Sequence, residues 1–153
     1  MPLEPGDDAP DFTLLDQDGA TFSLSTSLEE RKAPHLLYFF PRADTPGCTK
    51  QSCGLRDVAD RIGDTAIVGI SPDPPAKLAK FAVKHGLGFT LLADQDHAVA
   101  EAYDSWGEKS MYGRRYMGII RSAFLVGPDG RVVHAWYKVS PKDTPRNLVA
   151  ALG

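Results

Sequence analysis

Long apolar runs are missing from this sequence of 153 residues. Its most apolar stretches, such as residues 35–40, are far shorter than the roughly 20 residues that a membrane-spanning helix requires. The first eight residues contain neither the basic region nor the apolar core of a secretory signal. We therefore expect a cytoplasmic protein that has no membrane partner.

An excess of positive charge is also missing. The 17 Lys and Arg residues against 20 Asp and Glu residues give a formal net charge of −3, so no overall attraction draws the chain toward nucleic acid. Cysteine is scarce, because Cys48 and Cys53 are the two cysteines of the sequence. In a reducing compartment such a pair is more often reactive than structural. The four histidines stand too far apart in the sequence to complete a metal site with the two cysteines.

Repeats, low-complexity segments and long linkers are absent from the sequence. A chain of this length buries roughly 70% of the surface that its unfolded form exposes, and it needs no disulfide or structural metal to fold. We therefore expect one domain that spans residues 1–153.

The spacing of apolar residues predicts alternating strands and helices. Strands are expected over residues 12–15, 21–24, 35–40, 66–70, 89–92, 119–126 and 132–137. Helices are expected over residues 48–62, from Pro74 past Ala82 with Asp73 as a cap, over 97–103 with Asp94 or Asp96 as a cap, and over 144–152. This order predicts an α/β, thioredoxin-like fold with a central mixed β-sheet, flanking helices and an N-terminal β-hairpin.

Cys48 stands where the strand over 35–40 gives way to a helix. The first turn of a helix has unpaired amide groups and the positive end of the helix dipole, which together stabilise an anion such as a thiolate. Many cysteines are only small buried apolar residues. The turn-forming residues around Cys48 favour a reactive thiol instead.

Residues 41–48 resemble the peroxiredoxin signature Pro-x-x-x-Thr-x-x-Cys, which Pro41, Thr45 and Cys48 match. Residues 45–57 are similar to the bacterioferritin-comigratory-protein or PrxQ branch of that family, in which a second cysteine follows five residues after the first. The likeness extends from about residue 6 to residue 139, through segments such as 106–113 and 118–126. It implies a thioredoxin-like fold and an antioxidant thiol peroxidase that reduces hydrogen peroxide and organic hydroperoxides.

The resemblance also implies roles for individual residues. Cys48 would be the peroxidatic nucleophile, and the Thr45 hydroxyl would contact its thiolate and a peroxide oxygen. Arg121 would supply a fixed positive charge, and Pro41 would limit the access of water. Cys53 would be the resolving thiol, forming an intramolecular disulfide that thioredoxin or a related dithiol protein reduces. No metal, haem, flavin or selenium is implied, and an intramolecular disulfide favours a monomer.

Other interpretations stay open at this point. Arg121 could be a surface ion-pair residue and Cys53 an inert helix residue. A dithiol oxidoreductase that acts on proteins usually has Cys-x-x-Cys, whereas four residues separate the thiols here. A redox sensor without turnover could share the fold. Asp44 is interpreted as a solvated loop charge. The basic cluster of Lys109, Arg114 and Arg115 is interpreted as an exposed loop rather than a docking patch for an acidic reductase.

Helix geometry adds a prediction about the two cysteines. Five residues along one helix separate their Cα atoms by about 8.6 Å. A disulfide requires roughly 4.4–6.8 Å, so the segment from Cys48 to about Leu55 must unwind when the disulfide forms. Gly54 makes the unwinding easier, because glycine in a helix costs about 1 kcal/mol relative to alanine.

Overall fold

The computed structural model describes residues 2–152. The strands are β1 (Thr13–Asp16), β2 (Thr21–Ser23), β3 (His35–Phe39), β4 (Ala66–Ser71), β5 (Thr90–Ala93), β6 (Trp106–Met111), β7 (Arg114–Ile119), β8 (Ser122–Val126) and β9 (Val132–Trp136). The helices are α1 (Leu24–Arg31), α2 (Pro46–Asp57), the short 3-10 helix η1 (Ala59–Arg61), α3 (Pro75–His85), α4 (Ala98–Ala102) and α5 (Asp143–Leu152). Across residues 2–152, no helix is long and apolar enough to cross a membrane.

A mixed sheet with the order β2-β1-β5-β4-β3-β8-β9 forms the centre of the molecule. β3 pairs in parallel with β4 and antiparallel with β8. Every residue of β3 is buried, as expected for a strand that is covered on both faces. The thioredoxin-like fold with its mixed sheet, flanking helices and N-terminal strand pair is therefore confirmed.

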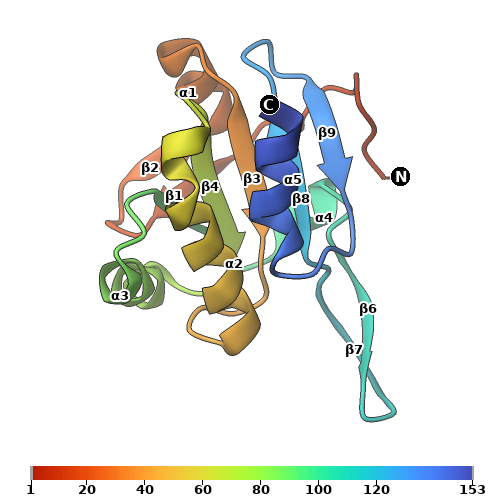
Figure 1. Ribbon diagram of the computed structural model, residues 1–153. Coiled ribbons are helices and arrows are strands. Elements are labelled where there is room, and N and C mark those ends of the chain that lie inside the picture. The colour runs from red at the N-terminus through yellow and green to blue at the C-terminus, as the bar shows by residue number, and fades with distance from the viewer. Residues whose placement is uncertain (1, 153) are drawn as a thin grey trace.

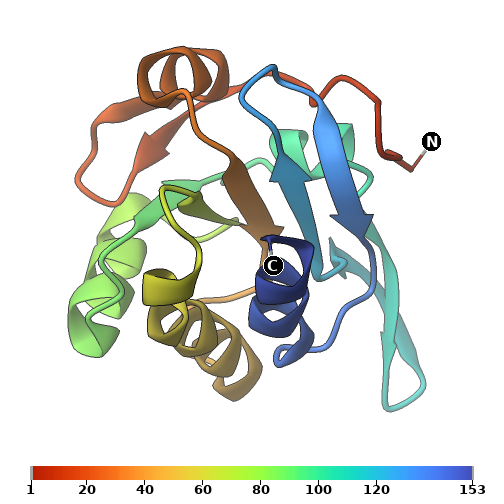
Figure 2. The same cartoon turned by 45° about the horizontal axis from the view of Figure 1, so that its top comes forward.

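Helices cover both faces of this sheet, with α2, α3 and α5 on one side and α1 and α4 on the other (Figures 1 and 2). Alternate residues of β3 divide between the two cores, because successive side chains of a strand point to opposite faces. Leu36 and Tyr38 pack in the core beneath α2, whereas Leu37 and Phe39 pack in the core beneath α1. The alternation fixes which face of the sheet α2 covers.

Several predicted boundaries were wrong. α1 was not predicted, because its serines and threonine are weak helix formers and Leu24 read as the end of a strand. The helix expected over 48–62 begins at Pro46, ends at Asp57 and is followed by η1. The strand expected over 119–126 is two strands, since β7 ends at Ile119 and β8 begins at Ser122. The hairpin formed by β6 and β7 was missed.

One predicted helix cap was also wrong. Asp73 does not cap α3, whose N-cap is Pro74 without a side-chain hydrogen bond. The carboxylate of Asp73 instead accepts hydrogen bonds from the amide of Ala43 and the hydroxyl of Ser71, each at 2.6 Å. Asp73 therefore fixes the loop that precedes α2. Asp94 does act as a cap, because its carboxylate accepts from two amides at the start of α4.

Candidate active site

Cys48 is the third residue of α2, within the helix's first turn. Thr45 is the N-cap with an extended backbone, and Pro46 occupies the first helical position, where a missing N–H costs nothing. The Cys48 side chain is fully buried. The sequence thus begins a helix directly after the loop that follows β3. Cys48 is thereby placed among the unpaired amide groups of the first helical turn.

Arg121 supplies the cation beside this thiol. One terminal nitrogen, Nη2, donates to the Cys48 sulfur at 3.4 Å. Arg121 directly precedes β8, and the register of β8 with β3 pairs Ser122 with Phe39, so the sheet brings it to the end of β3. A Cβ atom at Gly47 would lie 3.2 Å from the same nitrogen. Glycine there leaves room for the guanidinium against α2.

Gln51 holds the guanidinium in place, and sequence reasoning missed it. Its Oε1 accepts from Nη1 of Arg121 at 2.6 Å, and its Nε2 donates to the Thr144 hydroxyl at 2.8 Å. Gln51 and Thr144 are both buried. The signal available was the position of Gln51 three residues after Cys48, which places both on one helix face. No local signal identified Thr144, which belongs to α5.

The structure does not bring every predicted residue to the sulfur. The Thr45 hydroxyl donates to the carbonyl oxygen of Arg42 at 2.8 Å. Pro41 is half-buried in the loop after β3. The catalytic roles expected for Thr45 and Pro41 therefore stay predictions.

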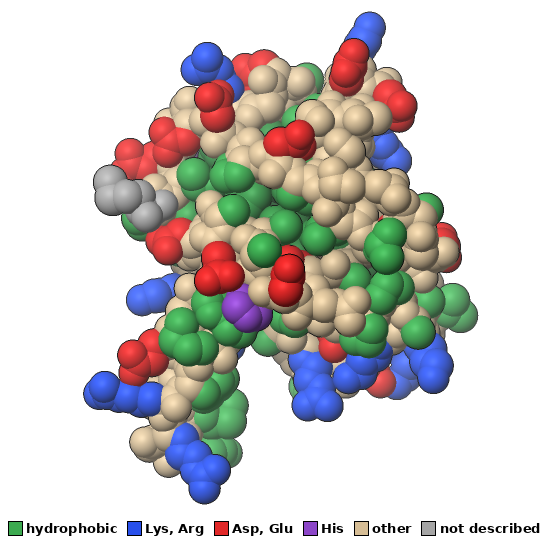
Figure 3. All heavy atoms as spheres, turned by 180° about the vertical axis from the view of Figure 1, so that it is seen from behind, with side chains coloured by type: hydrophobic (Ala, Val, Ile, Leu, Met, Phe, Trp, Pro, Cys, Tyr) green, Lys and Arg blue, Asp and Glu red, His purple; other side chains and the backbone are tan. Residues whose placement is uncertain are grey.

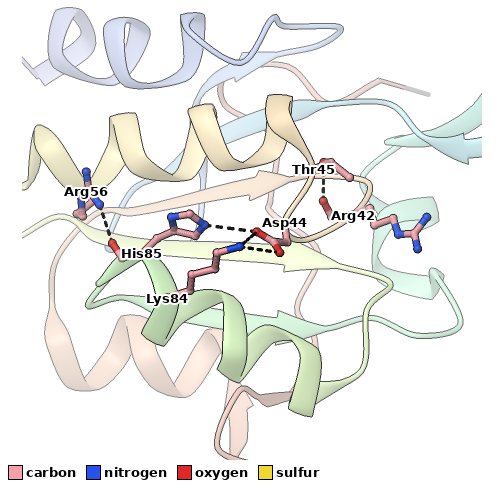
Figure 4. A network of polar contacts seen from close by, with 6 residues as sticks. All are labelled: Arg42, Asp44, Thr45, Arg56, Lys84 and His85. Atoms are coloured by element: carbon pink, nitrogen blue, oxygen red, sulfur yellow. Dashed lines mark hydrogen bonds and ion pairs between the residues drawn. The ribbon is translucent and has the colours of Figure 1, made fainter.

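Asp44 is exposed, but its charge is paired rather than only solvated. Its backbone is left-handed with φ 62°, and its two carboxylate oxygens accept from the Lys84 ammonium at 3.0 and 3.1 Å. The Lys84 hydrogen bond holds the pKa of the Asp44 carboxyl below its usual value. The His85 ring lies 3.5 Å from the same carboxylate, and the Arg56 guanidinium donates to the His85 carbonyl at 2.6 Å (Figure 4). The last turn of α3 thus holds the chain at both ends of α2.

Cys53 lies further along α2, half-buried, and both cysteines are free thiols. The neighbouring Ser52 hydroxyl forms a 2.8 Å hydrogen bond with Tyr38 of β3 in the buried core. Burial raises the pKa of Tyr38 far above its ordinary value, so the phenol stays neutral. A Cβ atom at Gly54 would lie 2.9 Å from Pro145, which indicates that glycine is needed there for α2 to approach α5.

Lys109 of β6 corrects another expectation. It is half-buried rather than part of an exposed loop. Burial lowers the pKa of its ammonium, the positive charge of Arg121 lowers it further, and the charge of Cys48 opposes both effects. Lys109 therefore lies within electrostatic reach of the thiol. Across residues 2–152, no three His, Cys, Asp or Glu side chains are grouped so that they could hold a metal ion.

Comparisons with known proteins identify the family of the chain. The sequence profile of the AhpC/TSA family matches residues 5–135. Peroxiredoxin Bcp of Escherichia coli (strain K12) is 48% identical over 137 residues, which cover 88% of this chain and 86% of that protein. Peroxiredoxin Bcp of Bacillus subtilis (strain 168) is 43% identical over 146 residues, covering 94% and 90% of the two chains.

Solved structures are similar as well. Peroxidoxin BcpB from Mycobacterium tuberculosis superposes with a TM-score of 0.85 at 33% identity, covering 98% of this chain and 96% of that one. Xanthomonas campestris bacterioferritin comigratory protein, described for its alkyl peroxide reduction activity, superposes with a TM-score of 0.84 at 32% identity, covering 92% and 89%. The chain therefore belongs to the AhpC/TSA family, among the peroxiredoxins of the Bcp and PrxQ type.

Proposed function

We propose that this peroxiredoxin reduces hydrogen peroxide and organic hydroperoxides with Cys48 as its nucleophile and Cys53 as its resolving thiol. The observation that carries the proposal is the Arg121 guanidinium, 3.4 Å from the Cys48 sulfur at the first turn of α2. A cation and a helix N-terminus both stabilise a thiolate, which is the reactive form of cysteine. The alkyl peroxide reduction described for the Xanthomonas campestris relative supports the substrate class.

The first step consumes the peroxide. The Cys48 thiolate attacks one peroxide oxygen, a sulfur–oxygen bond forms, and the oxygen–oxygen bond breaks. Cysteine is oxidised to sulfenic acid, and the leaving oxygen takes a proton and departs as water or an alcohol. Arg121 lies where its donors can stabilise the negative charge that develops on the oxygens. Gln51 keeps that guanidinium oriented through its 2.6 Å hydrogen bond.

Access to the sulfur requires motion, since Cys48 is fully buried. Thr45 borders the site through its position at the N-cap. We assign its hydroxyl to the peroxide once the substrate has entered, in exchange for the Arg42 carbonyl. Pro41 limits water beside the same loop and carries no N–H that could compete for the peroxide.

The second step forms the disulfide. The Cys53 thiol attacks the sulfenic sulfur of Cys48, a sulfur–sulfur bond forms, and water leaves. A protein dithiol such as thioredoxin then donates two electrons and two protons, becomes a disulfide itself and restores both thiols. The half-buried position of Cys53 on the same helix as Cys48 supports resolution within one chain.

Two serine variants test the proposal. Cys48→Ser should abolish peroxide consumption, because a neutral hydroxyl cannot replace a thiolate as the nucleophile. Cys53→Ser should keep one peroxide turnover and then gain oxygen atoms at excess peroxide, as intact mass would record. Turnover above the uncatalysed rate in Cys48→Ser would refute the assignment.

A coupled assay separates this function from its alternatives. Sustained NADPH oxidation with peroxide, thioredoxin and thioredoxin reductase is expected of a peroxidase. A redox sensor would stop after one turnover. A protein oxidoreductase would react faster with disulfide substrates than with peroxide.

A further inference from the structure

The β6–β7 hairpin projects from the body of the molecule as an arm (Figures 1 and 3). Its base is fixed: the Ile120 amide donates to the Ser105 carbonyl at 2.8 Å, and the Trp106 ring stacks on His97 with 3.7 Å between ring centroids. Among residues 2–152, the two strands pair only with each other and form a separate two-stranded sheet. The arm is therefore held firmly at its base while its outer part lies outside the core.

Large apolar side chains are exposed on this arm. Tyr112 at the tip is 99% exposed, Met111 and Met117 are each 56% exposed, and Tyr116 is 41% exposed. Single exposed apolar residues are ordinary on protein surfaces, but a cluster of them on one projecting element marks an interaction site. Tyrosine and methionine are also residue types that protein interfaces favour.

The strand register places part of this cluster on one face with positive charge. Lys109 pairs with Tyr116 and Met111 pairs with Arg114, so these four side chains share a face, which we call the arm face. Met111, Tyr112, Arg114 and Tyr116 line a hollow of about 330 Å³ on it. Arg115 points to the opposite face, where it pairs with Glu108 at 3.4 Å. Within the described residues, Arg114 has no such acidic partner.

The base of the arm lies close to the Cys48 thiol. β7 ends at Ile119, two residues before the arginine that contacts the Cys48 sulfur. Lys109, on the arm face, lies within electrostatic reach of both Arg121 and Cys48. The base of the arm therefore lies next to Cys48, and the exposed residues of the arm face lie further out along the same two strands. A protein large enough to contact the arm face can also reach the site at which a Cys48–Cys53 disulfide would form.

We propose that the arm face, together with Tyr112, is the docking surface for the dithiol protein that reduces the Cys48–Cys53 disulfide. The inference rests on the proposed function. One thiolate of the partner attacks a sulfur of this disulfide, forms a mixed disulfide and releases the other sulfur as a thiolate. The partner's second thiol then displaces the restored cysteine, so that two electrons and two protons pass from the partner to this chain.

Charge identifies the class of partner. The arm carries three cations, Lys109, Arg114 and Arg115, and one acid, Glu108, in a chain whose net charge is −3. Complementary charges speed the encounter of two proteins and fix their orientation. The fitting partner is an acidic protein with an apolar patch around its dithiol. A second copy of this chain is also acidic, but it is not the reductant that the disulfide requires.

Paired variants test the docking surface. Arg114→Glu reverses the unpaired charge, and Lys80→Glu makes the same change at an exposed lysine on α3. Tyr112→Ser removes the apolar side chain at the tip of the arm. Its control is Val83→Ser, which removes an apolar side chain that is 84% exposed on α3. Each variant is oxidised with peroxide and reduced in parallel by a negatively charged thioredoxin and by dithiothreitol.

We expect kcat/KM for thioredoxin to fall about tenfold in Arg114→Glu and in Tyr112→Ser, a loss equivalent to about 1.4 kcal/mol. The α3 variants should match the wild type, and dithiothreitol should reduce all five proteins equally. Unchanged reduction by thioredoxin in both arm variants would overturn the proposal, as would an equal loss with dithiothreitol. A wild-type dimer that Arg114→Glu dissociates would assign the surface to a second copy instead. A wild type without dithiothreitol-supported peroxidase activity would refute the proposed function and not the docking surface alone.

Discussion

At the scale of single residues, the site is a chain of contacts that runs from Cys48 through Arg121 and Gln51 to Thr144. Each link is short, at 3.4, 2.6 and 2.8 Å in that order. These contacts join α2 to the start of α5, and Arg121, which lies between β7 and β8, takes part in two of them. The position of the cation therefore depends on Gln51, which binds the guanidinium, and on Thr144, which binds Gln51.

Replacing the cation should weaken the nucleophile. Arg121→Met keeps most of the unbranched apolar part of the side chain and removes the charge, so we expect less thiolate at neutral pH and a second-order rate with peroxide about 100-fold lower. Ultraviolet absorbance of the thiolate and stopped-flow kinetics measure the two effects. An unchanged absorbance together with an unchanged rate would make Arg121 a structural residue.

Replacing Gln51 should act through the cation. Gln51→Leu leaves the Arg121 and Thr144 groups without their buried partner, and we expect a loss of about 1–3 kcal/mol in the free energy of unfolding. The rate with peroxide should fall about tenfold, because the guanidinium is no longer oriented. Gln51→Glu retains the acceptor for Arg121 and should recover most of that rate. If both variants lost stability while the peroxide rate stayed normal, Gln51 would have no role in positioning.

At the scale of elements, α2 carries both thiols, and the proposed disulfide between them requires this helix to change shape. We predict that amides between Thr49 and Arg56 are protected from hydrogen exchange in the reduced protein and exchange faster in the disulfide form, whereas β3 and β4 are unchanged. The unwinding would separate Ser52 from Tyr38 and Gly54 from Pro145. Hydrogen exchange by mass spectrometry on both states measures this, with Cys53→Ser after peroxide treatment as the control. Equal protection of α2 in the two states would contradict the unwinding.

The same scale separates what the sequence could predict from what it could not. β3 and the start of α2 follow from local signals, namely a continuous apolar run, then turn residues, then helical spacing. The β6–β7 arm gave no such signal, since most residues of its two strands are exposed and its apolar residues do not alternate with polar ones. The contact of Gln51 with Thr144 joins residues that are 93 positions apart, and no local pattern encodes a pairing of that range.

At the scale of the whole molecule, His35 links stability to pH. It is fully buried at the start of β3, with Nδ1 3.0 Å from the Ala33 carbonyl and Nε2 2.7 Å from the Ser27 hydroxyl. Burial lowers its pKa from 6.5. The unfolded chain therefore binds a proton at a higher pH than the folded chain does, and acidification favours unfolding.

We predict that the free energy of unfolding is constant with respect to His35 above pH 6.5 and falls below it, by at most about 1.4 kcal/mol per pH unit, until the folded protein also takes up the proton. Urea titrations at a series of pH values measure the slope. His35→Gln should flatten it over this window, because glutamine does not titrate. Parallel slopes in the two proteins would show that another group is responsible.

The attachment of α2 to the last turn of α3 has a further consequence in terms of chain entropy. Asp44, just before the 12-residue helix α2, and Arg56, near its end, both contact α3. An unwound α2 would therefore be a short closed loop rather than a free segment. A closed loop explores far fewer conformations than a free chain, and the entropic cost of closing it has already been met by the fold. In the proposed cycle, rewinding after reduction is then a local search between two fixed points, and we expect each cycle to unfold no more than this loop.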